Sequence, residues 1–343
     1  MMHEIDIVYA STRAHAYRTY LIPLETIKRD LINSKSLEEL VGFLQLTRYR
    51  DYMVQLAEVT LESLVNGFKS YFSDIAERFI KVLPGNARDL METHLFRFDI
   101  DGVLEVISEK MAGIEHKSRD YYVLPFTKVD IGRFLKAETV DACVDQLAYP
   151  PFNIDKAYID LWKKYRTIYI IEMALRRQYY IKYIRALEHL EEEDRDSLGE
   201  IIGTEIDITN IAIAIGPLLY GYSPSIAWDM LIPYEYKVSL ESLKKAYGLE
   251  TEVIMKMVPE PYKDVAEYYL VGSDIKAKSL GGRIIMRKIL AMLHKFPIHF
   301  TYVYGIIRLF EFEYRNLKAI AESIYYGLAP TEIKELLILD ESL

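Results

Sequence analysis

Three acidic residues recur at nearly constant intervals along the chain and are the first candidates for chemistry. Asp207 follows Asp99 by 108 residues, and Glu313 follows Asp207 by 106. Carboxylates serve as general acids, bases or metal ligands when several of them converge on one site. Three equivalent carboxylates in three separate modules make a poor active site, so we favour a structural role. An enzyme with a central site built from Asp207 and Glu313 is the alternative.

Each acid begins a longer pattern, in which an asparagine, a glycine and a proline follow at gaps of three, eleven and three residues. The pattern is complete in two copies, Asp207, Asn210, Gly221 and Pro224, and Glu313, Asn316, Gly327 and Pro330. The copy that begins at Asp99 keeps Val103 and Gly113, but it has Gly102 in place of the asparagine and His116 in place of the proline. Glycine can take the positive φ that closes a helix, and proline suits the first turn of the next one.

This pattern suggests what its polar members do. An acid one turn before an asparagine, near a helix start, can hold backbone N–H groups. Asn210 and Asn316 can tie neighbouring helices together. Arg315 should point outward and is therefore the better candidate for contact with a partner.

A second set of residues repeats in the same order. Its three copies are Leu37, Leu40, Leu44 and Tyr49; Val140, Cys143, Leu147 and Phe152; and Glu250, Val253, Met257 and Tyr262. They precede the three acids by similar distances: 55 residues from 44 to 99, 60 from 147 to 207, and 56 from 257 to 313. Two patterns in the same order three times indicate a threefold internal repeat, with units at 1–130, 131–236 and 237–343.

The chain is predicted to be all-α, with five or six helices in each repeat. Residues 154–190 read as one long helix, the longest of the chain. Residues 211–215 alternate as a strand would, but the equivalent residues after Asn316 have helical periodicity, so we predict helix there too. Gly281 and Gly282 are predicted to mark a loop.

Composition and motifs exclude several functions. The net charge of −9 argues against nonspecific nucleic-acid binding, which needs clustered positive charge. The single cysteine, Cys143, lies on an apolar helical stripe and is best interpreted as a small buried hydrophobe. No Walker A or Gly-x-Ser-x-Gly motif is present, and the seven histidines are scattered. No catalytic, cofactor-binding or metal-binding residue is therefore predicted.

The N-terminal sequence has no apolar core of the kind that a signal peptide needs. No uncharged apolar run reaches the roughly eighteen residues that span a bilayer. We therefore expect a protein that is soluble or at most peripheral to a membrane.

Two stretches carry a family resemblance, TRAHAYRTYLIPLETIKRDLINSKSLEELVGFL (12–44) and FEFEYRNLKAIAESIYYGLAPTEI (310–333). With the triplicated helical unit, they resemble the C subunit of archaeal A-type ATP synthases, the counterpart of the d subunit in V-type ATPases. The resemblance covers the whole chain. Residue-level inferences from it are weakest in the first repeat, which departs from the pattern at Gly102 and His116.

This resemblance implies a noncatalytic adaptor of the central stalk, without cofactor, small-molecule substrate or nucleic acid. Three helical lobes would form a funnel on the cytoplasmic face of the membrane. The funnel would seat the central shaft (D/F-type subunits) on the rotor ring of proteolipid subunits and pass torque between them. Partner contacts are expected on loops and helix ends at the two mouths. A helical-repeat scaffold that binds other partners is the alternative.

Overall fold

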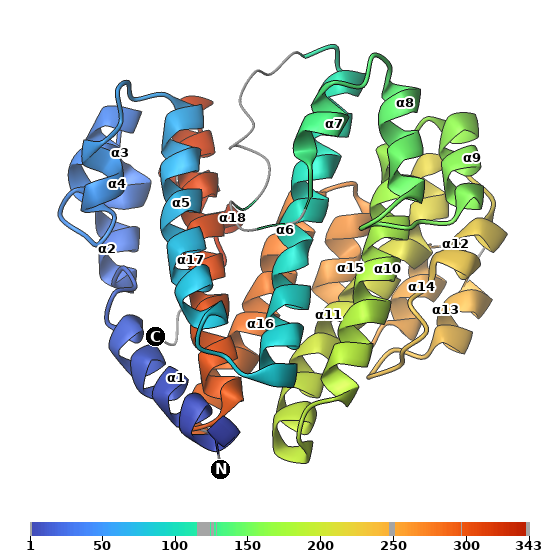
Figure 1. Cartoon of the computed structure of the whole chain (residues 1–343). Helices are drawn as coiled ribbons and strands as arrows, with labels where there is room; N and C mark the ends of the chain where they lie inside the picture. Colours follow the sequence, from blue (N-terminus) through green and yellow to red (C-terminus); the bar gives the residue numbers. More distant parts are fainter. Residues whose placement is uncertain are drawn as a thin grey trace. The chain divides into compact units, whose positions relative to one another are not determined.

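The computed structural model describes residues 2–114, 124, 127, 129–246, 251–295 and 297–340. Every regular element in these ranges is a helix, and they contain no strand, so the predicted all-α class is confirmed (Figure 1). His116 and Glu250, which belong to the two repeated patterns, lie outside the described residues.

The helices differ widely in length, and most of the short ones lie between the long ones. In chain order they are α1 (Met2–Arg18), α2 (Leu24–Arg29), the 3-10 helix η1 (Leu31–Asn33), α3 (Leu37–Leu44), α4 (Arg50–Val54), α5 (Leu61–Ile80), α6 (Gly85–Met111), α7 (Ile131–Leu135), α8 (Val140–Asp145), the 3-10 helix η2 (Gln146–Ala148), α9 (Lys156–Tyr165), α10 (Ile168–Glu188), α11 (Glu192–Tyr220), α12 (Pro224–Met230), α13 (Leu240–Ala246), α14 (Thr251–Met257), α15 (Lys263–Leu270), α16 (Asp274–Lys295), α17 (Phe300–Tyr325) and α18 (Pro330–Leu336).

Three pairs of long helices recur along this order: α5 with α6, α10 with α11, and α16 with α17. The second helix of each pair has 26 to 29 residues and carries one repeated acid near its middle. The expectation that the acids lie near helix starts is therefore wrong. Gly113, Gly221 and Gly327 follow the three helix ends with φ of 71°, 69° and 73°, the conformation expected of a glycine stop.

The single long helix predicted at 154–190 is wrong, because α9 ends at Tyr165 and α10 begins at Ile168. Arg166 takes φ of 54°, and its N–H donates to the carbonyl of Trp162 at 2.7 Å, which closes α9. The side chain of Thr167 then caps α10 by accepting from the N–H of Tyr169. The helix predicted at 211–215 is confirmed within α11, the longest helix that the structure describes.

Gly281 and Gly282 do not form a loop, since they lie inside α16 and are buried. A Cβ atom on Gly282 would lie 2.8 Å from Cδ1 and 2.9 Å from Cγ1 of Ile338. The glycine is therefore there for close packing of the segment that follows α18, and not for a turn.

The chain divides into two compact units, which are described separately. Unit 1 comprises Met1–Arg88, Glu191–Ile201 and Ser273–Leu343, and unit 2 comprises Asp89–Leu190 and Ile202–Gly272. Within unit 1, α17 is the central helix, because it contacts α1, α3, α5, α16 and α18 and is buried over most of its length (Figure 1). Within unit 2, α10 contacts α9 and α12.

One helix in the described ranges, α11, is long and apolar enough to cross a membrane by length and composition. Of its most apolar window, 89% is buried inside the protein. Burial of this kind is typical of the core helix of a globular fold, so α11 gives little support for a membrane span.

The packing at Gly282 gives a prediction for unit 1. Gly282→Ala should destabilise the protein by about 1–3 kcal/mol, because the added methyl group displaces buried Ile338. Gly42→Ala is the control: Gly42 is an exposed glycine of α3 with nothing within 4 Å of its missing Cβ. That change should be neutral or stabilise by up to about 1 kcal/mol. Urea unfolding measures both, and equal midpoints for the two variants would contradict the packing argument.

Candidate functional site: the repeated acid and asparagine

The two asparagines of the repeated pattern make the same pair of hydrogen bonds. Asn316 Nδ2 donates to the carbonyl of Ile338 at 2.9 Å, and its Oδ1 accepts from the Ile338 N–H at 2.7 Å. Asn210 makes the equivalent bonds to Ile232, at 3.2 and 2.8 Å. In both copies the partner lies 22 residues further along the chain, after one short helix. Each buried amide therefore ties that returning segment to the long helix.

Asp207 is buried in the middle of α11 and also binds backbone groups. Its carboxylate accepts from the N–H of Lys237 at 2.9 Å and from that of Val238 at 3.4 Å. The hydroxyl of Tyr262 lies beside it. Burial raises the pKa of Asp207, and the N–H donors partly offset that rise. The acid thus holds the segment that leads into α13.

Glu313 occupies the equivalent position in α17 and is also buried. Its Oε2 accepts from the N–H of Ile22 at 2.6 Å, and its Oε1 accepts from the hydroxyl of Tyr49 at 3.0 Å. Burial raises the pKa of Glu313 to about 7, although both donors favour the charged form. Burial and the charge of Glu313 also raise the pKa of neighbouring Tyr71.

The aromatic residues of the second repeated pattern complete these contacts. Tyr49, from the first repeat, donates to the acid of the third, and Tyr262, from the third, lies beside the acid of the second. Phe152, from the second repeat, packs on Phe96 of α6 with ring centroids 5.5 Å apart, one turn before Asp99. Each repeat thus sends its aromatic residue to the acid-bearing helix of the preceding repeat, and the first repeat sends its own to the third. Sequence reasoning missed this exchange because it assigned the two patterns to one unit.

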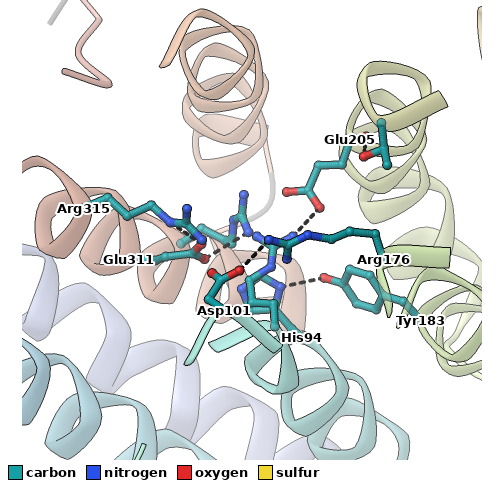
Figure 2. A network of polar contacts seen from close by, with 10 residues as sticks. His94, Asp101, Arg176, Tyr183, Glu205, Glu311 and Arg315 are labelled. Carbon is teal, nitrogen blue, oxygen red and sulfur yellow. Dashed lines mark hydrogen bonds and ion pairs between the residues drawn. The ribbon is translucent and has the colours of Figure 1, made fainter. Parts of the chain in front are cut away.

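Arg315 is less available to a partner than its sequence position suggests. Its Nε lies 3.0 Å from Oε1 of buried Glu311, and its side chain is 39% exposed. Arg308 binds the other oxygen of Glu311 at 3.0 Å. Figure 2 shows Arg315 turned toward Glu311. The charge of Arg315 is thus largely used within unit 1.

Unit 2 contains a second set of polar contacts, buried or partly buried, that sequence reasoning did not identify. Arg97 Nη2 lies 2.8 Å from Glu205 Oε2, and both side chains are buried. Arg176 pairs with Asp101, and His94 Nδ1 lies 3.1 Å from the hydroxyl of Tyr183 (Figure 2). A signal for the first pair was present: Arg97 and Glu205 each precede a repeated acid by two residues, so they occupy the same repeat position with opposite charge.

Comparison with known proteins identifies the family. The family described as "ATP synthase (C/AC39) subunit" matches residues 10–336. The chain belongs to this family. It is 25% identical to the A-type ATP synthase C subunit of Methanocaldococcus jannaschii, over 90% of this chain and 80% of that protein. The A-type ATP synthase C subunits of a Desulfurococcus species and of Pyrococcus abyssi are 25% and 22% identical, each over 96% of this chain and 89% of theirs.

This C/AC39-family protein is therefore a component of a rotary ATPase, a membrane-associated complex. Asp207 and Glu313 accept from backbone N–H groups, and Glu313 also accepts from the Tyr49 hydroxyl, so these two carboxylates hold segments in place. Burial raises the pKa of Cys143 to about 11, which keeps the thiol protonated at neutral pH. The described ranges contain no group of three acidic, histidine or cysteine side chains that could hold a metal ion.

The asparagine contact predicts a loss of stability. Asn316→Ala should cost about 2–4 kcal/mol, because it leaves the buried N–H and carbonyl of Ile338 without their partner. Asn33→Ala is the control, because exposed Asn33 bonds carbonyls that water can reach. It should cost less than about 0.5 kcal/mol. Thermal unfolding measures both, and equal melting temperatures would show that the Asn316 amide contributes little.

The raised pKa of Glu313 predicts a pH dependence. Between pH 4.5 and 7 the folded protein keeps a proton that the unfolded chain has lost, so stability falls as pH rises. The decrease should total roughly 3 kcal/mol. Glu313→Gln cannot ionise, so its stability relative to the parent protein should increase across this window.

Urea unfolding at pH 4.5, 6 and 8 measures the effect. Glu62→Gln, at an exposed position of α5, should follow the parent protein at each pH. A constant difference between the parent and Glu313→Gln would mean that Glu313 titrates normally.

Proposed function

We propose that this protein is the noncatalytic adaptor of the central stalk in a rotary A/V-type ATPase. It seats the shaft subunits on the membrane ring of proteolipid subunits and transmits torque for coupled ATP synthesis or hydrolysis and ion transport. The observation that carries the proposal is the family match over residues 10–336. Other subunits of such a complex handle ATP, and this chain couples them to the ring.

A part that transmits torque must be stiff, and the acid-bearing helices fit that need. Helices of 26 to 29 residues are about 40 Å long. α17 is braced by five neighbouring helices. Asn210 and Asn316 fix further segments through pairs of buried hydrogen bonds, and fully satisfied buried polar contacts rigidify a core.

The proposed shape is a funnel of three lobes, one from each of the repeats 1–130, 131–236 and 237–343. The recurrence of a long helix pair with an acid in its second helix supports three similar lobes. We place the funnel at the cytoplasmic face of the membrane, where it is peripheral. Burial of the apolar window of α11 inside the protein fits a peripheral subunit.

Exposed apolar side chains at helix ends are the best candidates for partner contacts. Such residues lie at or just after the end of each acid-bearing helix: Met111 and Ile114 at α6, Leu218 and Tyr220 at α11, and Tyr325 and Tyr326 at α17. The most exposed of these is Tyr326, at 72%. Aromatic residues are enriched at protein interfaces, where their apolar area is buried by the partner. A scaffold with other partners would use the same surfaces, so only the identity of the partner separates the two functions.

Affinity purification tests the proposal. The tagged chain, isolated from gently solubilised native membranes, should bring down a small, very hydrophobic ring protein together with shaft and nucleotide-binding subunits. Mass spectrometry identifies them, and an unrelated protein with the same tag is the control. Asn316→Ala should lower the melting temperature more than it lowers recovery of the ring, because its amide is buried. Recovery of soluble partners alone would remove the adaptor function.

A further inference from the structure

We propose that residues 6–33 form a strap that docks on the third repeat and releases as a unit, with Glu313 as its clasp. The strap contains the described side chains of α1 together with α2 and η1. It precedes the first repeat's long helices in sequence, yet its main contacts are with α17 and α18. This inference stands independently of the proposed function.

The contact between Glu313 and Ile22 resembles one in unit 2, where the acid and its backbone partner are close in sequence. Asp207 holds Val238, two residues before α13, and Glu313 holds Ile22, two residues before α2. The difference lies in chain connectivity. Val238 follows Asp207 by 31 residues, whereas Ile22 and Glu313 are 291 residues apart. Glu313 therefore joins segments from opposite ends of the chain, whereas Asp207 joins neighbouring ones.

The strap buries little apolar surface through its first helix. The buried side chains of α1 are small or partly polar, namely Ala10, Ser11, Ala14 and Tyr17, while Val8 and Tyr9 are about half exposed. Small side chains gain little from burial, which contributes roughly 25 cal/mol per Å². Segments with few buried apolar contacts are the ones that open first in native proteins.

Polar contacts to the third repeat add to the attachment of α1, beside the contacts of Tyr17 with Arg78 and Phe79 of α5. The Ser11 hydroxyl donates to the carbonyl of His299 at 3.2 Å, and His15 Nε2 lies 2.9 Å from the carbonyl of Pro297. The His15 ring also stacks on Tyr302 with centroids 4.0 Å apart. Both hydrogen bonds are at least partly exposed to solvent, so water can replace them at low cost.

The bond from Ile22 to Glu313 differs from these because it is buried. It is also short, at 2.6 Å, and its acceptor belongs to a carboxyl group that is itself buried. Breaking it leaves a buried polar group without that partner, which costs more than losing an exposed bond. The bond at Ile22 is therefore the strap's buried polar fastening, beside the buried side chains of Ile27, Leu31 and Ile32.

Hydrogen exchange followed by mass spectrometry on the full-length chain tests the strap. Glu313→Leu keeps a similar volume but removes the acceptor for the Ile22 N–H. Exchange in peptides from residues 6–33 should rise at least tenfold, while peptides from α5 and α16 stay within about twofold of the parent. Glu313→Gln retains an acceptor oxygen and should raise exchange in the strap by less than about threefold.

Asp207→Leu is the matched control in unit 2. Its effect should be confined to residues near Lys237, because Asp207 accepts from backbone N–H groups of that segment and not from the strap. If α5 and α16 lose protection together with the strap, or if strap exchange is unchanged in Glu313→Leu, the proposal is wrong.

The parent protein provides a second test in case Glu313→Leu does not fold. In native-state exchange at low urea concentrations, residues 6–33 should open at a lower free energy than α5 and α16. A single opening free energy shared by the strap and these helices would overturn the proposal.

Discussion

Unit 1 depends on a carboxyl group that is buried in the middle of a long helix and hydrogen-bonded by backbone from a distant segment. Placing Glu313 there has a cost, because burial disfavours its charged form and raises its pKa. The cost is partly offset by two donors that lie far away in sequence, the Ile22 N–H and the Tyr49 hydroxyl. A packing that places these donors beside Glu313 is therefore more stable than one that leaves the buried carboxyl group without them. The acid therefore specifies which segments α17 accepts.

Much of the helical fold could be predicted from sequence. The periodicity after Asn316 and the glycine stops at Gly221 and Gly327 depend on local backbone preference, which sequence patterns report well. The break at Arg166 and the helical position of Gly282 could not be predicted in this way. The first needs a non-glycine residue at positive φ, and the second depends on Ile338 approaching from 56 residues away. Glycine alone does not reveal whether it serves a turn or close packing.

The sequence predicted which residues belong to the candidate site, but it did not predict which groups they bind. Asp207, Asn210, Glu313 and Asn316 stood out because their spacing repeats. Their partners did not stand out, since backbone N–H groups such as that of Ile22 carry no sequence signal. Arg97 and Glu205 illustrate a signal that was available and missed. Equivalent repeat positions with opposite charge can pair directly, as Arg97 and Glu205 do, and burial of such a pair is by itself weak evidence for added stability.

The first copy of the pattern, on α6, lacks both the asparagine and the tyrosine that the other two acid-bearing helices have. It has Gly102 where the other copies have an asparagine, so its long helix has no amide at that position to hold a returning segment. The aromatic residue that packs on the same helix is Phe152, where the others have tyrosine, so it brings no hydroxyl to Asp99. Both polar groups are thus missing from one helix, although Gly102 and Phe152 belong to different repeats. Phe152 packs instead between Phe96 and Phe134, with centroids 5.5 and 5.9 Å away. At α6, apolar packing thus stands where the other two helices have part of their polar attachment. The structural unit is therefore the acid-bearing helix together with the aromatic residue that packs on it, and this unit combines residues from two sequence repeats.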